Sequence, residues 1–515
     1  MRTPNRRQAL GAGLSVSAIV GLSACGTATG SSLDAGKPVK GGTLRAGVTG
    51  GNAADTIDAH IPVNSGDIAR TVNLYNCLLS RTDDYKIQPE LAESFEPNGD
   101  ATVWTATIRE GAKFSDGRDI TPDDVVFSFE RINDPDDPKA AAASFTMLDK
   151  VVATGKRTVE FRLSEPNGLL NDSVSEYTTG IVPSDYDPKN PVCSGPFKLK
   201  SHDPGQSTVM ERNDYYWRKD GGFLDEAAIL NFNDSDALIN ALLSSQVDAI
   251  AQIPLALVEV IGADERMNIL NSKTGMWLPF TMRVDRPPFD DVKVRQAFRL
   301  VVDRDQMIEQ VLSGFGTVGN DMFGPLSENF PDFPQRKQDI PKAKKLLAEA
   351  GYPDGLEVEL VTAPIQSGVV EAAQVFAQQA AEAGIRVKIR KVDATTFFGD
   401  EYLQWDFAQD FWYTRDFLPQ CVSCAMDESP FNETHWDDPG FTKIVEKARG
   451  ISDSADRKNL EHEAQKQLYD DGGYIIWGFA NQVDAYQKYV GGLVPNATGR
   501  PLSGWRLDRV WIGKV

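Results

Sequence analysis

The sequence is poor in the residues that carry most metal and nucleophile chemistry. It contains five cysteines in 515 residues and four scattered histidines, His60, His202, His435 and His462. No G-x-S-x-G or H-E-x-x-H motif occurs, and Cys421-x-x-Cys424 has no second pair at zinc spacing. Gly314–Gly319 fits G-x-G-x-x-G, but it follows a helical run rather than a strand, so we interpret it as a loop. We therefore expect no metal site, no cofactor and no catalytic residue.

Positive charge is also scarce. The 53 lysines and arginines are outnumbered by 74 aspartates and glutamates, which gives a formal net charge of −21. Because such a surface repels a phosphate backbone, the composition gives no support to a nucleic-acid partner. A chain of 515 residues is longer than a domain with a single hydrophobic core usually is, so we expect it to divide into two or three lobes.

Long apolar runs are missing after residue 25, so no membrane-spanning helix is expected. Residues 1–24 are typical of an export signal, because Arg6 and Arg7 precede an apolar stretch that ends in Leu-Ser-Ala-Cys. That ending matches the bacterial lipobox, in which the thiol of Cys25 receives a diacylglyceryl group and becomes the new N-terminus. The alternative is an ordinary signal-peptidase site beside an incidental cysteine. The twin arginines indicate the Tat route, and the Sec route stays open.

Residues 89–132 carry the strongest local pattern in the chain. The segment 103–108 alternates as a strand with one apolar face. After a turn, Thr121 is placed to cap a helix, with Pro122 at its first position and Asp124 completing a capping box. This stretch therefore predicts a compact strand, turn and helix.

The sequence of the same stretch resembles the signature region of the family 5 extracellular solute-binding proteins, the oligopeptide, dipeptide and nickel receptors of ABC importers. The matching motifs are P-E-L-A-E-S-F, I-R-E-G-A-K-F-S-D-G and I-T-P-D-D-V-V-F-S-F. From Pro287, P-P-F-D-D-V-K-V-R-Q-A-F-R-L-V-V-D-R resembles a second family signature. The resemblance implies an α/β, two-lobed periplasmic-binding-protein-like fold with an extra subdomain in the first lobe and a two-strand hinge.

Domain boundaries follow from this resemblance together with helix and strand patterns. A helix that stops at Gly384 and is followed by an alternating strand is typical of an α/β unit in the second lobe. We expect a signal peptide at 1–24, a lipid-anchored flexible tether at 25–40, lobe I at 41–277 with a peripheral subdomain at 61–193, lobe II at 278–481, and a return to lobe I at 482–515.

The best candidate for a ligand site is the segment 411–416, F-W-Y-T-R-D. In peptide-binding members of the family the corresponding segment contains W-x-x-D, whose carboxylate receives the ligand's α-amino group, and another subset has W-x-x-R. Trp412 to Arg415 fits the second spacing, while Asp416 lies one residue late for the first. A guanidinium suits a carboxylate because it offers two parallel donors. The alternative is a core tryptophan beside a surface Arg–Asp pair.

The resemblance suggests three further residues for the cleft. Asn52 lies in the loop after the first strand, and Trp277 and Trp477 lie near the expected hinge. For each tryptophan the alternative is a place in the hydrophobic core.

The cysteines raise a separate expectation. In an exported protein, Cys421 and Cys424 are expected to close a small disulfide loop. Cys77 and Cys193 are then a second bridge or two buried thiols.

The resulting expectation is a monomeric substrate-binding lipoprotein of an ABC importer, held by lipid at the outer face of the cell membrane or periplasmic. It captures a small solute, a short peptide or peptide-like zwitterion, between its lobes and delivers it to a permease without chemistry. Two alternatives stay open. One is a solute-sensing receptor without transport, and the other is an exported hydrolase, for which no nucleophile and base are visible.

Replacing Cys25 by alanine should leave an unprocessed precursor that takes up no labelled palmitate, because this thiol is the lipid acceptor. Metabolic labelling and electrophoresis measure the effect. The control Ser23→Ala keeps the cysteine and should label like the wild type. Equal labelling of Cys25→Ala and the wild type would contradict the lipoprotein interpretation.

Overall fold

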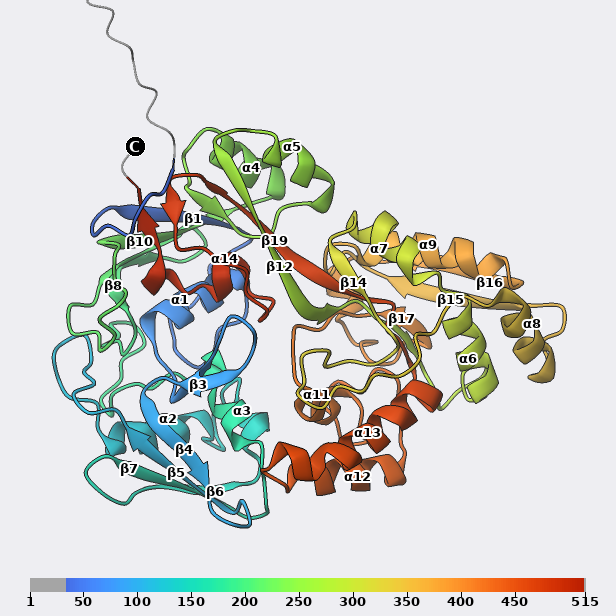
Figure 1. The fold of residues 1–515 in the computed structure, drawn as a ribbon, viewed down its shortest axis with the longest axis horizontal. Helices are drawn as coiled ribbons and strands as arrows, with labels where there is room; N and C mark the ends of the chain where they lie inside the picture. Colours follow the sequence, from blue (N-terminus) through green and yellow to red (C-terminus); the bar gives the residue numbers. More distant parts are fainter. Residues whose placement is uncertain (1–33, 514–515) are drawn as a thin grey trace, which may run out of the picture.

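The computed structural model describes residues 34–513. The predicted export signal, Cys25 and the first part of the tether lie outside the described residues. Figure 1 shows two lobes side by side, joined by the long strands β12 (Met267–Trp277) and β19 (Gly478–Gln487). None of the helices within residues 34–513 combines the length and the apolar character needed to cross a bilayer.

Lobe I is built on an eight-stranded sheet in the order β12-β19-β11-β1-β10-β9-β8, with β14 paired to β19 off this path. Strand β1 is parallel to β10 and β11, and the other pairs are antiparallel. A Cβ at Gly47 would lie 2.5 Å from the end of the Leu238 side chain, so a larger residue there would force that side chain of helix α4 to shift. The remaining strands of this sheet are β1 (Thr43–Thr49), β8 (Phe197–Asp203), β9 (Ser207–Arg212), β10 (Glu226–Phe232), β11 (Ala249–Ile250) and β14 (Gly316–Val318). Strands β20 (Val490–Gly491) and β21 (Trp511–Ile512) form a separate two-stranded sheet, and the helices are α1 (Ser65–Leu74), α4 (Ser235–Leu243), α5 (Val258–Gly262) and α14 (Pro501–Gly504).

A second, antiparallel sheet in lobe I has the order β4-β5-β7-β6. Its strand β5 (Val103–Ile108) buries Trp104, Ala106 and Ile108, as the alternation predicts. Helix α2 (Pro122–Ile132) starts as predicted, because the Asp124 carboxylate accepts from the backbone N–H of Thr121 at 2.8 Å. The other elements here are β2 (Leu79–Arg81), β3 (Ile87–Pro89), β4 (Ala92–Pro97), β6 (Leu148–Ala153), β7 (Thr158–Leu163) and α3 (Leu170–Val174).

Lobe II is built on a five-stranded sheet in the order β16-β15-β17-β13-β18. Helix α9, Gly384 with φ +85° and strand β16 form the predicted α/β unit. The strands are β13 (Phe280–Met282), β15 (Leu356–Thr362), β16 (Ile385–Lys391), β17 (Phe407–Gln409) and β18 (Tyr474–Ile475), and the helices are α6 (Val292–Leu300), α7 (Arg304–Leu312), α8 (Ile340–Glu349), α9 (Val369–Ala381), α10 (Ala394–Phe397), α11 (Phe417–Cys424), α12 (Pro439–Arg449) and α13 (Ser454–Asp471).

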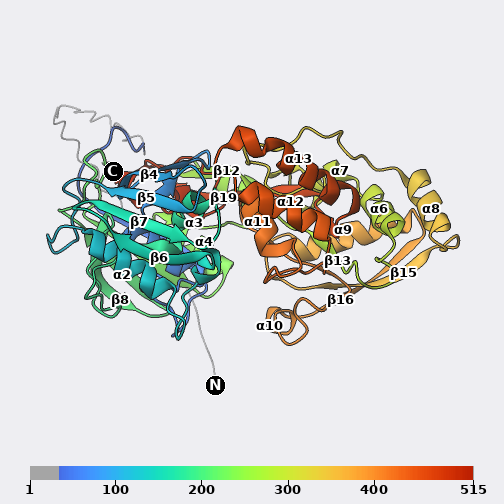
Figure 2. The same ribbon diagram turned by 90° about the horizontal axis from the view of Figure 1, so that it is seen from below.

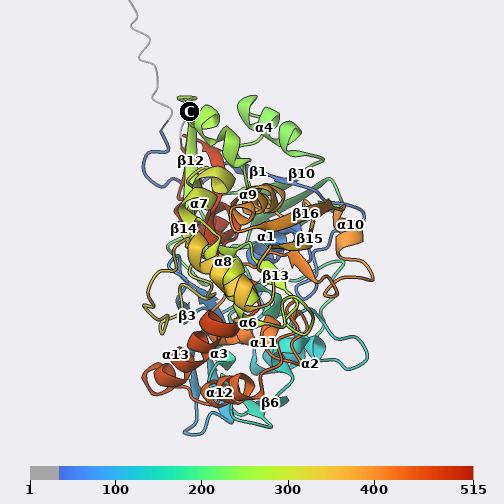
Figure 3. The same cartoon turned by 90° about the vertical axis from the view of Figure 1, so that its right-hand side faces the viewer.

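The side views show which helices of lobe II approach lobe I. Seen from below, α11, α12 and α13 lie on the side of lobe II next to the four-stranded sheet of lobe I (Figure 2). Seen from the side of lobe II, α6 and α8 lie in front, with α12 and α13 below them (Figure 3). Helices α11 and α12 therefore lie on the side of lobe II that faces lobe I.

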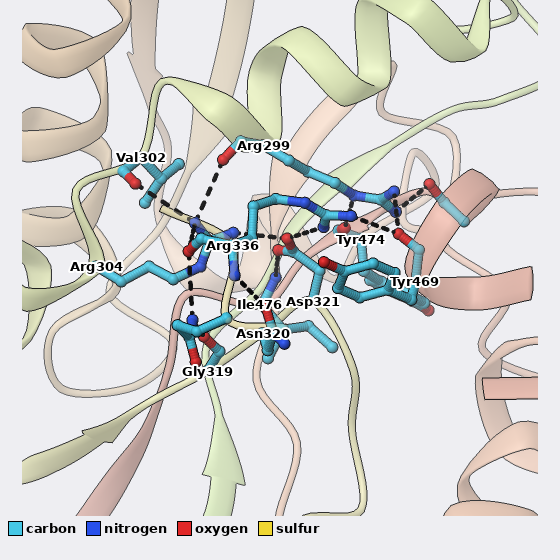
Figure 4. Close-up of polar contacts among 12 residues, drawn as sticks. Arg299, Val302, Arg304, Gly319, Asn320, Asp321, Arg336, Tyr469, Tyr474 and Ile476 are labelled. Carbon is cyan, nitrogen blue, oxygen red and sulfur yellow. Dashed lines mark hydrogen bonds and ion pairs between the residues drawn. The ribbon is translucent and has the colours of Figure 1, made fainter. Parts of the chain in front are cut away.

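Lobe II encloses a buried charge network centred on Asp321 (Figure 4). Its carboxylate accepts from Arg304 Nη2 at 2.6 Å, from Arg336 Nη1 and from the backbone N–H of Ile476 at 2.9 Å. The neighbouring Arg299 donates instead to carbonyl oxygens, including that of Tyr474 at 3.0 Å. Burial alone would raise the pKa of Asp321, but the charges of the three arginines lower it below its usual value. One carboxylate thus ties together segments that are far apart in the sequence.

Asp321→Asn should lower the free energy of unfolding by roughly 3–5 kcal/mol, because it leaves buried guanidinium groups without their counter-charge. Since the carboxylate has a depressed pKa in the folded state, its contribution is present above the unfolded pKa of about 4 and is lost as the pH falls. The difference between variant and wild type should therefore shrink in acid. Urea unfolding followed by fluorescence measures both effects.

The control for this experiment is Asp406→Asn. Asp406 pairs with Arg286 on the surface, and its side chain is 63% exposed. Its loss should cost about 1 kcal/mol or less. Equal destabilisation by the two variants would show that the buried network contributes no more than a surface pair.

Candidate functional site

The candidate site lies where the segment 411–416 of lobe II meets the end of the hinge strand β12. Trp277 at the end of β12 and Trp412 after β17 exchange two backbone hydrogen bonds of 3.0 and 2.9 Å. Their rings stack with centroids 6.1 Å apart, and Trp277 also stacks on Phe323 at 5.5 Å. Trp277 is 1% exposed and Trp412 is 8% exposed. Both tryptophans therefore belong to a packed aromatic cluster that fixes the start of the segment 411–416.

The buried carboxyl group of Glu433 holds the indole of Trp412, and Asp410 lies near Glu433. Trp412 Nε1 donates to Glu433 Oε1 at 3.0 Å, and the hydroxyl of Tyr474 contacts the other carboxylate oxygen of Glu433. Burial, and then the charge of Asp410, raise the pKa of Glu433 well above its usual value. Burial also raises the pKa of Asp410 to about 6. The indole is thus held by a hydrogen bond to a buried carboxyl group.

Thr414 anchors the same segment to lobe I. Its hydroxyl donates to the carbonyl of Ala497 at 2.8 Å and accepts from the N–H of Gly275 at 2.9 Å. Its own carbonyl accepts from the hydroxyl of Tyr85 at 2.8 Å. The residues that follow, Arg415 and Asp416, are therefore held at the boundary between the lobes.

Arg415 lines a cavity of about 350 Å³ between the lobes, which we call the Arg415 cavity. Its guanidinium lies over the ring of Trp412, 5.5 Å from the centroid, and donates to Ser423 Oγ. Among the described residues it forms no ion pair. The wall from lobe II also contains Ser423 and Arg449, and the wall from lobe I contains Asp172, Glu176 and Tyr177.

Asp416 faces a different cavity of about 320 Å³, the Asp416 cavity. Its carboxylate accepts from Arg81 Nη1 of lobe I at 3.1 Å. Arg81, whose side chain is 3% exposed, also pairs with Asp172 and donates to the carbonyl of Tyr85 at 3.1 Å. Burial alone would lower the pKa of Arg81, but the charges of Asp172, Tyr85 and Asp416 raise it. Asp416 is therefore occupied by an ion pair between the lobes, whereas Arg415 meets only neutral partners.

The lobes also meet away from the hinge. The backbone N–H of Gly168 in lobe I donates to the carbonyl of Arg449 in lobe II at 2.6 Å. A Cβ at Gly168 would lie 2.4 Å from the backbone of Ile451, so this contact requires glycine. The two lobes are thus in contact at the hinge and beside both cavities.

Three candidate residues lie elsewhere. The side chain of Asn52 accepts from the N–H of Ala54 at 2.7 Å and lines neither cavity. Trp277 is enclosed by the aromatic cluster, and Trp477, 1% exposed, lies in the hydrophobic core of lobe II. Packing of the hinge accounts for the position of both tryptophans.

The structure corrects the expectation for the cysteines. Cys421 and Cys424 are free buried thiols on helix α11, not a disulfide. Each packs into the aromatic cluster, and Cys424 Sγ accepts from Gln420 Nε2 at 3.2 Å. Because helix α11 is continuous through both residues, the two thiols lie in different surroundings and no disulfide loop forms. Cys77 and Cys193 are also free, and burial raises the pKa of each to about 12.

Sequence reasoning missed Arg81, Glu433 and Arg449. No local motif marks any of them, and each acts on partners from distant segments. No group of three or more His, Cys, Asp or Glu side chains within the described part of the chain is arranged to hold a metal ion.

Two lobes that enclose charged cavities beside a pair of hinge strands have the architecture of a solute-binding protein. A sequence profile described as "Bacterial extracellular solute-binding proteins, family 5 Middle" matches residues 86–422. The chain belongs to this family, which consists of solute-binding proteins rather than enzymes.

The similarity to known proteins extends over most of the chain. The dipeptide-binding protein of Escherichia coli is 26% identical over 84% of this chain and 88% of its own length. The glutathione-binding protein GsiB of Pectobacterium atrosepticum is 24% identical over 84% of this chain and 88% of its own. The structure of AgaA from A.tumefacien R10 in complex with agropinic acid has 26% identity and a TM-score of 0.77 over 92% of this chain and 99% of that one. The predicted family and the predicted two-lobed α/β fold are confirmed.

Proposed function

We propose that the chain is the substrate-binding lipoprotein of an ABC importer and that it captures a small peptide-like zwitterion between its lobes. The observation that carries the proposal is Arg415, a guanidinium without an acidic partner among the described residues, in a cavity between the lobes. A carboxylate of the solute would accept two parallel hydrogen bonds from it. The names of the relatives, which bind dipeptides and glutathione, favour a solute of this kind.

The mechanism is closure about a hinge. We take lobe I as 41–277 with 482–515, lobe II as 278–481, and the hinge as the crossings near Trp277 and Asn481. Because both lobes line the Arg415 cavity, a solute there binds the closed form more tightly than the open form. The ion pair between Arg81 and Asp416 adds to the same closed form.

Delivery requires the chain to stay near its permease. Lipidation of Cys25 would hold the body at the outer face of the membrane, and residues 26–40 would act as the tether. The closed form is then presented to the permease subunits. The chain itself carries out no chemistry in this scheme.

Arg415→Gln should weaken the binding of a dipeptide about ten- to a hundredfold, because a charge-assisted hydrogen bond contributes roughly 1.5–3 kcal/mol. Asp416→Asn, its chain neighbour, should change binding less than about fivefold, because Asp416 contacts Arg81 across a partly exposed pair. Calorimetric titration with a dipeptide panel measures both, and unfolding curves check that each variant is folded. Lost binding in Asp416→Asn with unchanged binding in Arg415→Gln would show that Asp416 anchors the ligand amine instead.

A further inference from the structure

The Arg415 cavity contains a second arginine without a counter-charge. Arg449, the last residue of α12, extends toward lobe I, and its one side-chain hydrogen bond is to the thioether sulfur of Met147 at 3.9 Å. A thioether is a weak acceptor. Burial lowers the pKa of Arg449, and Glu446 and Glu165 act on it through their charge without forming an ion pair in the described part of the chain. This cation is therefore held in a costly position with almost no compensation.

Other buried arginines of the chain have stronger acceptors than a thioether. Arg295 and Arg299 donate to backbone carbonyls, including those of Phe289 at 2.6 Å and Tyr474 at 3.0 Å, and others have carboxylate partners. Arg81 pairs with Asp172 and Asp416, Arg304 with Asp321, and Arg283 with Asp285 at 2.7 Å. An arginine in a partly dehydrated place usually has such a partner, because an unpaired buried charge is strongly unfavourable. Arg449 has neither a carboxylate nor a carbonyl acceptor for its side chain among the described residues, and the exposed Arg415 in the same cavity forms no ion pair there, which indicates that a partner comes from outside the chain.

The opposite wall carries the complementary charge. The side-chain carboxylate of Glu176 in lobe I lines the same cavity and, within residues 34–513, accepts no hydrogen bond and forms no ion pair. The other acid on this wall, Asp172, pairs with Arg81, which also pairs with Asp416. The charged side chains that line the cavity without a charged partner among the described residues are therefore Arg415, Arg449 and Glu176.

We propose that the Arg415 cavity selects an anionic zwitterion: a solute with two carboxylates, one for Arg415 and one for Arg449, and an ammonium group for Glu176. This inference rests on the proposed function and deepens it. A peptide-like molecule with one acidic side chain has this set of charges, one for each of the three side chains. A neutral dipeptide would leave one guanidinium unpaired on closure.

Ala-Glu, Ala-Ala and N-acetyl-Ala-Glu are suitable calorimetric probes for the full-length chain. The wild type should bind Ala-Glu at least about tenfold more tightly than Ala-Ala. Arg449→Gln should remove this preference and leave Ala-Ala within about threefold of its wild-type affinity, while Arg449→Lys should restore part of the preference. Arg386→Gln, which removes an exposed arginine on β16, is the matched control and should keep the preference. An unchanged preference in Arg449→Gln would overturn the proposal.

Glu176→Gln tests the other wall. It should weaken Ala-Glu about tenfold but leave N-acetyl-Ala-Glu unchanged, because the acetylated peptide has no ammonium group. Equal weakening of both peptides would show that Glu176 does not meet the amine and would overturn that part of the assignment.

Glutarate separates this proposal from the proposed function, because it has two carboxylates and no peptide bond. If no dipeptide binds the wild type, peptide capture is wrong, and the effect of glutarate on the melting temperature then tests whether Arg415 and Arg449 bind two carboxylates. A glutarate-induced rise in the melting temperature that is smaller in Arg449→Gln than in the wild type supports this role of the two arginines. An equal rise in both proteins, or no rise in the wild type, overturns it.

Discussion

The antiparallel pairing of β12 and β19 joins the two lobes and fixes where the segment 411–416 lies. The ladder runs from Met267 opposite Gln487 to Trp277 opposite Phe479, with an irregularity between Ser272 and Met276. Thr274 fills this irregularity, since its hydroxyl donates to the carbonyl of Ala480 at 2.7 Å. A bulge bends a strand without breaking its pairing. The two strands can therefore pass from lobe I to lobe II as one hydrogen-bonded unit.

The end of the β12–β19 ladder determines where the charged side chains of Arg415 and Asp416 lie. Trp277 pairs with Trp412, Thr414 is anchored to lobe I, and the next two side chains then face different cavities. Asp416 forms an ion pair with Arg81 of the other lobe, so its charge is compensated within the contact between the lobes. Arg415 has only a hydroxyl and an aromatic ring as partners, so its charge stays available to a solute. The division of roles between two chain neighbours thus follows from the backbone of the hinge.

Local features of the fold were predictable because neighbouring residues determine them. The alternation of 103–108 predicts β5, and Thr121 with Asp124 predicts the start of α2. The segment Gly314–Gly319 was misread as a loop, because its strand β14 forms only by pairing with β19, about 160 residues away. The cysteine pair was also misread, since the C-x-x-C spacing fits a helix as well as a closed loop.

The site was predictable only where a family spacing marks it. The spacing from Trp412 points to Arg415, whereas Arg81, Glu176 and Arg449 carry no signal in a chain with 53 basic and 74 acidic residues. What distinguishes Arg449 and Glu176 is that both line one cavity without a charged partner among the described residues, and this combination is visible only in three dimensions. Charge pairing across hundreds of residues is a property of the fold rather than of the local sequence.

Native mass spectrometry of the gently purified protein tests the central claim most directly. The wild type is expected to carry a bound molecule on the order of a few hundred daltons, the size that a cavity of about 350 Å³ encloses, and Arg415→Gln is expected to lose it. Accurate mass after release would identify its acidic groups. A wild type without any bound molecule, or a molecule retained equally by Arg415→Gln, would contradict solute capture at this cavity.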